Sequence, residues 1–188
     1  MIAKAELRAA AKAARSSLSV EARRLASARA AEHVAKSALF RAAKRVALFA
    51  AMGDEADPSA LARLAEGKIL FFPRVAGSRL EMVQATPDLL TARGPFGIAE
   101  PPPSLPAADV ETIDLFIVPG LCFTRAGDRI GYGKGYYDHL LARAKQARTI
   151  GFAFEVQLFP ALPTESHDIR LDAIATEIAL TFVDPSLL

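Results

Sequence analysis

Three glycines, three tyrosines and a lysine occur together in the segment Gly131-Tyr132-Gly133-Lys134-Gly135-Tyr136-Tyr137-Asp138, which holds every tyrosine of the chain. Alternate glycines let a backbone turn sharply and approach a ligand closely. The lysine adds a mobile cation, and the aromatic rings add flat surfaces. This combination suits the binding of a phosphate group beside a planar heterocycle. We therefore predict that the segment, which we call the glycine loop, belongs to the active site.

The glycine loop differs from two well-known phosphate-binding loops. A Walker A loop has Ser or Thr after its Gly-Lys pair, whereas Gly135 follows Lys134 here. A dinucleotide-binding loop has the spacing G-x-G-x-x-G, whereas the spacing here is G-x-G-x-G. A purely structural crossover is the alternative for any glycine-rich turn. The presence of Lys134, the nearby Arg129 and the tyrosines favours a function.

The cysteine and histidine content indicates neither a disulfide nor a zinc site. The single cysteine, Cys122, excludes an internal disulfide and fits a reducing compartment. We interpret it as small apolar filler rather than a nucleophile, because no histidine lies near it in the sequence. The three histidines, His33, His139 and His167, lack the spacing of metal ligands, so we expect no zinc. His139 is expected on a helix surface.

Positive charge is concentrated near the start of the chain. Residues 1–45 carry 11 lysines and arginines against three glutamates, a net charge of +8, although the whole chain carries only +2. Lys4, Arg8, Lys12 and Arg15 recur at spacings of four, four and three, which places them on one face of a helix over residues 2–15. This stripe is compatible with a solvated helix face, a nucleic-acid patch or an anion clamp.

The elements that must position these residues form an alternating pattern. We expect a second helix over residues 20–36 after a Ser19 cap, and a third between Asp57-Pro58 and Gly67. A helix from Tyr136 to about residue 145 would direct its first N–H groups at an anion. The expected strands cover residues 46–50, 69–72, 80–84, 115–118, 149–154, 173–176 and 180–183.

This pattern predicts a single α/β domain over residues 1–188. The central sheet is expected to be largely parallel with helices on both faces, a three-layer α/β/α, Rossmann-like arrangement. The prolines between residues 100 and 109 form a loop and need not mark a boundary. Ligands of open α/β sheets bind beyond the carboxyl ends of strands. The loops after residues 50, 118 and 154 all follow expected strands, so they could meet at one cleft.

Size and hydropathy are consistent with one soluble domain. The chain has 188 residues, of which 52% are hydrophobic, enough to bury one substantial core. No apolar stretch is long enough to span a bilayer. We expect no membrane association.

The region from Pro119 to Asp138 also resembles the signature of a known family. Pro119-Gly120, Phe123, Gly127, Arg129 and the glycine loop match the pattern P-G-x-x-F-D-x-x-G-x-R-L-G-x-G-x-G-Y-Y-D of the 5-formyltetrahydrofolate cyclo-ligase family, also called 5,10-methenyltetrahydrofolate synthetase. One departure is that Thr124 stands where the family has Asp. The consequence of this departure for activity is open.

Four other segments carry the same resemblance. Lys4-Ala5-Glu6-Leu7-Arg8 is similar to the family's K-x-x-L-R element, and Phe96-Gly97-Ile98-Ala99-Glu100-Pro101 to its F-G-I-x-E-P element. Glu55 with Asp57-Pro58 resembles the acidic loop that contacts folate. His167-Asp168 resembles the late H-D element. The resemblance therefore covers nearly the whole chain.

The resemblance implies an ATP-dependent ring closure of 5-formyltetrahydrofolate to 5,10-methenyltetrahydrofolate, with release of ADP and phosphate. Phosphoryl transfer to the formyl oxygen would make it a leaving group, and N10 would then attack the activated carbon. In such reactions a protein mainly positions the reacting groups and neutralises the charge of the phosphates. Lys134 and Arg129 would be catalytic, stabilising the transferring phosphoryl group.

The binding residues that the resemblance implies fall into three sets. ATP, a co-substrate, would be held by Lys4, Arg8, Arg129, Ile130, Gly131, Tyr132, Gly133, Lys134, Gly135, Tyr136 and Tyr137. The folate would contact Ala50, Glu55, Tyr132, Gly133, Lys134, Gly135 and Tyr136. Mg²⁺ would be bound by Asp138 and Asp168.

Several of these residues have ordinary alternatives. Asp138 could complement the dipole of the following helix, and Asp168 could cap a turn or be oriented by His167. Tyr137 could be a core residue, and Glu55 a solvated loop carboxylate. Beyond Lys4 and Arg8, the basic stripe would be solvated at Lys12 and Arg15, or would attract a polyglutamate tail on the folate.

The expected partner is therefore a small-molecule folate, with or without a polyglutamate tail, and no nucleic acid. We expect a monomer. The Ala, Arg and Ser content of the opening is also found in organellar transit peptides. Because a functional element matches directly after Met1, we instead expect a cytoplasmic protein without a removable leader.

Two other classes of function compete with the ligase. A sugar-phosphate isomerase or acyl-transfer enzyme on a similar scaffold would need no ATP. A non-catalytic nucleotide- or RNA-binding protein would use the basic stripe and show salt-dependent binding, but it would leave the glycine loop unexplained.

Overall fold

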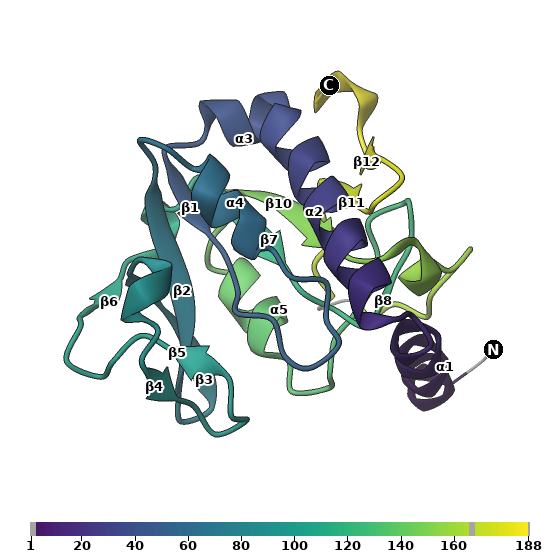
Figure 1. The fold of residues 1–188 in the computed structure, drawn as a ribbon, viewed down its shortest axis with the longest axis horizontal. Helices are drawn as coiled ribbons and strands as arrows, with labels where there is room; N and C mark the ends of the chain where they lie inside the picture. The colour runs from purple at the N-terminus through teal and green to yellow at the C-terminus, as the bar shows by residue number, and fades with distance from the viewer. Residues whose placement is uncertain (1–2, 166–167, 188) are drawn as a thin grey trace.

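The central sheet has a parallel middle and antiparallel edges. The computed structural model describes residues 3–165 and 168–187, and its main sheet has the strand order β12-β11-β10-β7-β1-β2-β3-β6 (Figure 1). Neighbours from β11 to β2 pair in parallel, whereas β12, β3 and β6 pair antiparallel. The bounds are β1 Arg45–Ala47, β2 Ile69–Ala76, β3 Arg79–Gln84, β6 Ala107–Ala108, β7 Leu115–Val118, β10 Arg148–Phe152, β11 Ala173–Ala175 and β12 Leu180–Phe182.

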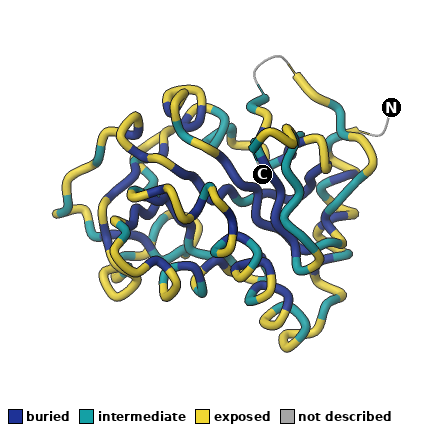
Figure 2. Tube along the Cα trace, turned by 90° about the horizontal axis from the view of Figure 1, so that it is seen from above, coloured by how far each residue is buried: buried dark blue, intermediate teal, exposed yellow. Residues whose placement is uncertain are grey.

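Helices cover both faces of this sheet. Side chains of α2 (Val20–Lys36), α3 (Ala38–Ala42) and α4 (Ser59–Leu64) bury one face, packing on strand residues such as Val46 and Ile117. α5 (Tyr136–Leu141) packs on the other face, against residues such as Phe116. The buried stretches accordingly gather along the central strands (Figure 2). The expected α/β fold with a largely parallel sheet and helices on both faces is confirmed.

Local signals in the sequence explain where several elements begin. The Ser19 side chain accepts a hydrogen bond from the Ala22 N–H at 3.1 Å and so caps α2. Pro58 precedes the first residue of α4, and Gly67 has the positive φ of 74° that the turn into β2 requires. All four residues of β7 are buried, as expected for a central parallel strand.

The observed boundaries correct some of the expected ones. The strand expected over residues 46–50 ends at Ala47, and β2 continues to Ala76 because it pairs antiparallel with β3. The helix expected to reach about residue 145 ends at Leu141. After that point the backbone makes turns, in which the Ala144 N–H bonds to the Leu141 carbonyl. The first helix, α1, covers Lys4–Ser16, and Ile2 lies outside the described residues.

Several short elements were not anticipated. Two small hairpins join β4 (Ala92–Arg93) to β5 (Ala99–Glu100) and β8 (Cys122–Phe123) to β9 (Arg129–Ile130). Single turns of 3-10 helix complete the fold: η1 Pro87–Leu89, η2 Val110–Thr112, η3 Glu155–Gln157 and η4 Pro185–Leu187. In the described part of the chain no helix has the length and apolar character needed to cross a membrane.

A separate small core fixes α1 against the β8–β9 hairpin. Leu7 and Ala11 of α1 pack with Leu121, Cys122 and Ile130, all of them buried. Burial raises the pKa of the Cys122 thiol to about 11, and the thiol hydrogen bonds to the Leu7 carbonyl. The interpretation of Cys122 as apolar filler is confirmed. This packing also fixes the basic stripe of α1 beside the glycine loop.

Candidate active site

One cavity of about 600 Å³ lies where α1, the loops after β1 and β7, and the β4–β5 hairpin meet. Every residue that the sequence placed in the site lines it: Lys4, Arg8, Ala50, Glu55, Arg129, Ile130, Gly131, Tyr132, Gly133, Lys134, Gly135, Tyr136, Tyr137, Asp138 and Asp168. Of the three loops expected to meet, the first two do. The third contributes through Glu165 and Asp168, but residues 155–157 do not line the cavity.

Arg129 forms the buried floor of one end of the cavity. Its side chain is 3% exposed and forms an ion pair with Asp138 at 2.5 Å. The guanidinium also lies over the Tyr137 ring, 5.9 Å from the centroid. Its Nε is buried without a hydrogen-bond partner among the described residues. Two segments of the signature, β9 and α5, are therefore joined by a charge pair at the cavity wall.

Lys4 and Arg8 bring the N-terminal helix to the same end. The Lys4 ammonium lies 2.8 Å from Glu165 and 3.1 Å from Asp168. Burial opposes its charge, but the hydrogen bonds to both carboxylates outweigh burial and raise the pKa of Lys4. The Arg8 Nε donates to the Gly131 carbonyl at 2.9 Å. Both cations thus line the cavity, and Arg8 is bonded to the glycine loop.

Lys134 differs from these cations because it is exposed and has no polar partner among the described residues. Within residues 3–165 and 168–187 it has no hydrogen-bond or ion-pair partner. Its neighbour Gly133 has φ of 92°, and a Cβ there would lie 3.4 Å from the Arg8 guanidinium. The loop conformation therefore requires glycine, and it leaves Lys134 able to move onto a ligand.

The other end of the cavity is apolar with carboxylates at its edge. Phe96 packs edge-on against Tyr136, with ring centroids 6.4 Å apart. Glu100 is only 7% exposed, and burial raises the pKa of its carboxyl group. A Cβ on Gly94 would collide with the Glu100 carboxylate. The remaining apolar lining consists of Phe49, Met52, Pro73, Val75, Leu80 and Ile98.

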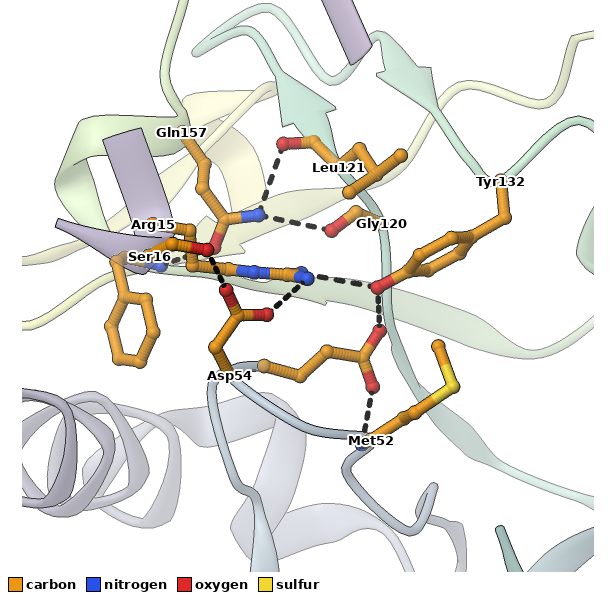
Figure 3. Close-up of polar contacts among 10 residues, drawn as sticks. Arg15, Ser16, Met52, Asp54, Gly120, Leu121, Tyr132 and Gln157 are labelled. Atoms are coloured by element: carbon orange, nitrogen blue, oxygen red, sulfur yellow. Dashed lines mark hydrogen bonds and ion pairs between the residues drawn. The ribbon is translucent and has the colours of Figure 1, made fainter. Parts of the chain in front are cut away.

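Glu55 connects the two ends through a network that includes the glycine loop (Figure 3). Tyr132 donates a short hydrogen bond from its hydroxyl to Glu55 Oε1, and the Met52 N–H donates to Oε2 at 2.8 Å. Burial raises the pKa of Glu55 and that of Tyr132. Arg15 donates to the same tyrosine oxygen at 3.1 Å. Glu55 is therefore held by the protein and is not a freely solvated loop carboxylate.

The expectation that Arg15 is solvated is wrong. Its residue exposure is 4%, because the end of α1 packs against the loop after β1. There it forms an ion pair with Asp54 at 2.5 Å. Lys12 is exposed as expected, and its ammonium lies 5.9 Å from the centroid of the Tyr132 ring. Three residues of the basic stripe, Arg8, Lys12 and Arg15, thus contact the glycine loop.

Two buried polar residues shape the segment that leads into the glycine loop. Gln157 donates to the carbonyls of Gly120 and Leu121, both at 3.0 Å, and accepts from the Phe154 N–H (Figure 3). Thr124, at the position of the family's Asp, closes the β8–β9 hairpin instead of lining the cavity. Its hydroxyl donates to the Asp128 carboxylate at 2.8 Å.

Asp138 and Asp168 have the chemistry to bind Mg²⁺ together with a phosphate. Both carboxylates line the cavity, and each pairs with a cation, Arg129 or Lys4. No group of three or more metal-binding side chains occurs among the described residues, and His167 lies outside them. Mg²⁺ is commonly bound by one or two carboxylates plus phosphate oxygens. The donor set therefore fits an ion that arrives with a nucleotide.

Sequence reasoning missed Phe96, Glu100, Arg15 and Gln157. The first two belong to the Phe96–Pro101 element, for which the family resemblance implied no role in the site. The spacing of Arg15 placed it on the same helix face as Lys4 and Arg8, which was a usable signal. Nothing in the sequence marks Gln157, because its partners lie 36 and 37 residues away.

The fold and cavity define an α/β protein that can bind an anion at one end of its site and a planar, largely apolar group at the other. Comparison with known proteins narrows this class. Residues 1–177 match the model of the 5-formyltetrahydrofolate cyclo-ligase family. A mouse 5-formyltetrahydrofolate cyclo-ligase is 32% identical over 149 residues, 71% of this chain and 73% of the mouse protein.

Solved structures agree with the sequence comparison. The 5,10-methenyltetrahydrofolate synthetase of Aquifex aeolicus superposes with a TM-score of 0.85 at 33% identity, covering 97% of this chain and 93% of that one. The synthetase from Mycoplasma pneumoniae has a TM-score of 0.75 at 20% identity, covering 94% and 99%, and so supports the fold. The chain belongs to the 5-formyltetrahydrofolate cyclo-ligase family.

Proposed function

We propose that the protein closes 5-formyltetrahydrofolate to 5,10-methenyltetrahydrofolate at the cost of one ATP, releasing ADP and phosphate. It is then a ligase that forms a cyclic C–N bond. The observation that carries this proposal is the cavity of about 600 Å³, in which a cationic end and an apolar end meet at the glycine loop. Membership of the family supplies the reaction, and the cavity supplies a place for both substrates in one chain.

The cationic end is proposed to bind ATP and stabilise the transferring phosphoryl group. The γ-phosphoryl group passes to the formyl oxygen, and charge develops on its equatorial oxygens during transfer. Lys134 is exposed and unpaired among the described residues, so it can move onto this group without breaking an ion pair. Arg129 is already fixed by Asp138, and Lys4 and Arg8 approach from α1. Preplaced charges of this kind lower the barrier.

The apolar end is proposed to hold the pterin of the folate. Phe96 and Tyr136 offer ring surfaces, and Ala50 lies on the adjacent loop. The carboxylates of Glu55 and Glu100 can accept hydrogen bonds from ring and amino N–H groups. With the ring fixed, N10 attacks the formyl carbon and gives up its proton, the bond from that carbon to the phosphorylated oxygen breaks, and phosphate departs with the electron pair of that bond.

Mg²⁺ bound to Asp138, Asp168 and the phosphates would neutralise charge on the nucleotide. In the protein without ligands these carboxylates pair with Arg129 and Lys4. Binding of the nucleotide would therefore exchange partners, with the cations moving toward phosphate oxygens and the carboxylates toward the metal.

The proposal extends to a monomer in the cytoplasm that accepts folates with a polyglutamate tail. The single buried cysteine fits a reducing compartment. Lys12 is exposed beside Tyr132 and could attract a polyglutamate tail. The orientation of the basic stripe toward the glycine loop argues against a nucleic-acid surface.

An isotope experiment tests the phosphorylated intermediate. The purified protein is given ATP, Mg²⁺ and 5-formyltetrahydrofolate labelled with ¹⁸O in the formyl group, and the released phosphate is analysed by mass spectrometry. One labelled oxygen is expected in each phosphate, because the formyl oxygen leaves bonded to phosphorus. Product formation with unlabelled phosphate would exclude this route.

A further inference from the structure

Arg15 is a buried cation whose partners come from two loops of the cavity. Its side chain is 5% exposed, although it lies in the last turn of a surface helix. One guanidinium nitrogen donates to the Tyr132 hydroxyl at 3.1 Å, and the other lies 2.5 Å from an Asp54 carboxylate oxygen. Figure 3 shows the guanidinium between these two groups. The residue therefore joins α1, the loop after β1 and the glycine loop.

The connection continues from Tyr132 to Glu55. The tyrosine hydroxyl accepts from Arg15 and donates to Glu55 Oε1, while the Met52 N–H fixes Oε2. Each carboxylate oxygen can accept a second hydrogen bond. Glu55 lines the cavity and so keeps acceptor capacity for a ligand while the protein sets its orientation. Asp54, next to Glu55 in this loop, also accepts a hydrogen bond from the Ser16 hydroxyl at 2.5 Å.

We propose that Arg15 is a positioning residue for the folate end: by holding Tyr132 and Asp54 together, it keeps Glu55 oriented for the N–H groups of the pterin. This inference rests on the proposed function. Arg15 itself does not line the cavity, so it acts through Tyr132.

The energetic cost of Arg15 favours a role in positioning. A buried ion pair is weak evidence for a gain in stability, because desolvation can exceed the attraction between the charges. Arg15 Nε is also buried without a hydrogen-bond partner in the described part of the chain. Burial opposes the charge of Arg15, and the hydrogen bonds to Tyr132 and Asp54 outweigh this effect and raise its pKa. The arrangement fixes three segments of one site.

A spectroscopic experiment tests the contact without relying on catalysis. The chain has three tyrosines, so protein labelled with ¹³C at tyrosine Cζ gives three signals, and Tyr132→Phe identifies one of them. Arg15→Gln is expected to shift the Tyr132 signal and leave the other two in place. Arg24→Gln is the matched control, because it removes an exposed ion pair on α2 and should shift none. An unshifted Tyr132 signal in folded Arg15→Gln would overturn the inference.

A double-mutant cycle then tests the effect on folate. Arg15→Gln and Tyr132→Phe should each raise the KM for 5-formyltetrahydrofolate about tenfold, as expected for loss of a hydrogen bond involving a charged group. The KM for folate in the double variant should be no higher than in the more impaired single variant, because both changes break the same connection. In Arg15→Gln the KM for ATP should change less than twofold, since Arg15 does not line the cavity and Lys4 and Arg8 are untouched.

Two results would contradict the positioning role. Independent, multiplicative effects of the two substitutions on the KM for folate would show that Arg15 does not act through Tyr132. A normal KM for folate in Tyr132→Phe would also contradict the positioning role. This variant tests the connection even if Arg15→Gln fails to fold. If wild-type protein is inactive but Arg15→Gln still shifts the Tyr132 signal, the result would count against the proposed reaction and not against the Arg15 contact.

Discussion

The two ends of the cavity use charge in opposite ways. At the cationic end, Lys4 and Arg129 already have carboxylate partners, and Arg8 has a backbone carbonyl. At the apolar end, burial raises the pKa values of Glu55 and Glu100. One end therefore holds compensated cations, while the other holds carboxylates that the protein compensates incompletely.

This difference teaches how each end would receive its ligand. A phosphate can take over cations from Asp138 and Asp168, so binding there is an exchange of partners. A pterin brings N–H donors. Binding at the apolar end would therefore supply hydrogen bonds to the carboxylates of Glu55 and Glu100. Lys134 is the exception at the cationic end, since it has no partner among the described residues to give up. It is the cation best suited to follow the phosphoryl group during transfer.

The largest expected effect comes from Lys134→Ala. Loss of a charge that acts mainly in the transition state should lower kcat about 10²–10³-fold. The melting temperature should stay within about one degree, because Lys134 is exposed and makes no ion pair with described residues. Methenyltetrahydrofolate absorbance and thermal unfolding measure the two quantities. A normal kcat would remove Lys134 from the catalytic role.

Phe96→Ala sharpens the role of the apolar end. Removing the ring loses its edge-on packing with Tyr136 and a surface for the pterin, so the KM for folate should rise about three- to tenfold. Leu89→Ala is a matched control, because Leu89 is 41% exposed against 46% for Phe96 and lies outside the cavity. Steady-state kinetics with each substrate varied in turn would give the KM values for folate and for ATP in both variants. An equal rise in the KM for ATP would break the division into two ends.

Gly133→Ala tests the cationic end through the backbone. The residue has φ of 92°, and its added Cβ would lie close to Arg8, so the KM for ATP should rise several-fold and stability should fall by about 1–2 kcal/mol. Gly77→Ala, with φ of 60° in the β2–β3 turn and no atom near its Cβ, should lose similar stability with an unchanged KM. Identical KM values in the two variants would argue against a tight glycine–Arg8 approach.

The smallest effect concerns the pH dependence of stability. The folded protein holds the Glu100 proton more tightly than the unfolded chain, so stability falls as pH rises from the ordinary glutamate pKa of about 4.3 to the raised folded pKa. The Glu100→Gln variant has no carboxyl group at this position, so it does not lose stability in this way as the pH rises. Its free energy of unfolding relative to wild type should therefore increase across that window and be constant above it. Urea unfolding at a series of pH values measures the difference, and a flat difference would show that Glu100 is compensated.

The sequence predicted the sheet and the cavity lining better than it predicted the hairpin and the buried polar contacts that surround them. β7 was predicted to the residue, because four consecutive apolar residues bounded by turns indicate a buried parallel strand. The signature loop and Lys4-Arg8 also carry local patterns. The β4–β5 hairpin has two-residue strands, too short for an alternating pattern, so the place of Phe96 could not be foreseen.

Arg15 and Gln157 show the limit more clearly. Helical spacing gave the face on which Arg15 lies but not the loop that covers it, since its partner Tyr132 is 117 residues away. A buried glutamine has no sequence pattern at all when its partners come from another strand end. Such polar contacts depend on the packed tertiary structure, which composition and periodicity do not encode.

The most direct test of a site with two cooperating ends is a coupled assay of the purified protein with 5-formyltetrahydrofolate, Mg²⁺ and ATP. Methenyltetrahydrofolate absorbance and phosphate release are followed together, with a parallel reaction lacking ATP. The two-ended site predicts one phosphate per methenyltetrahydrofolate and no product without ATP. Product formed without ATP, or folded protein that binds neither ligand, would contradict it.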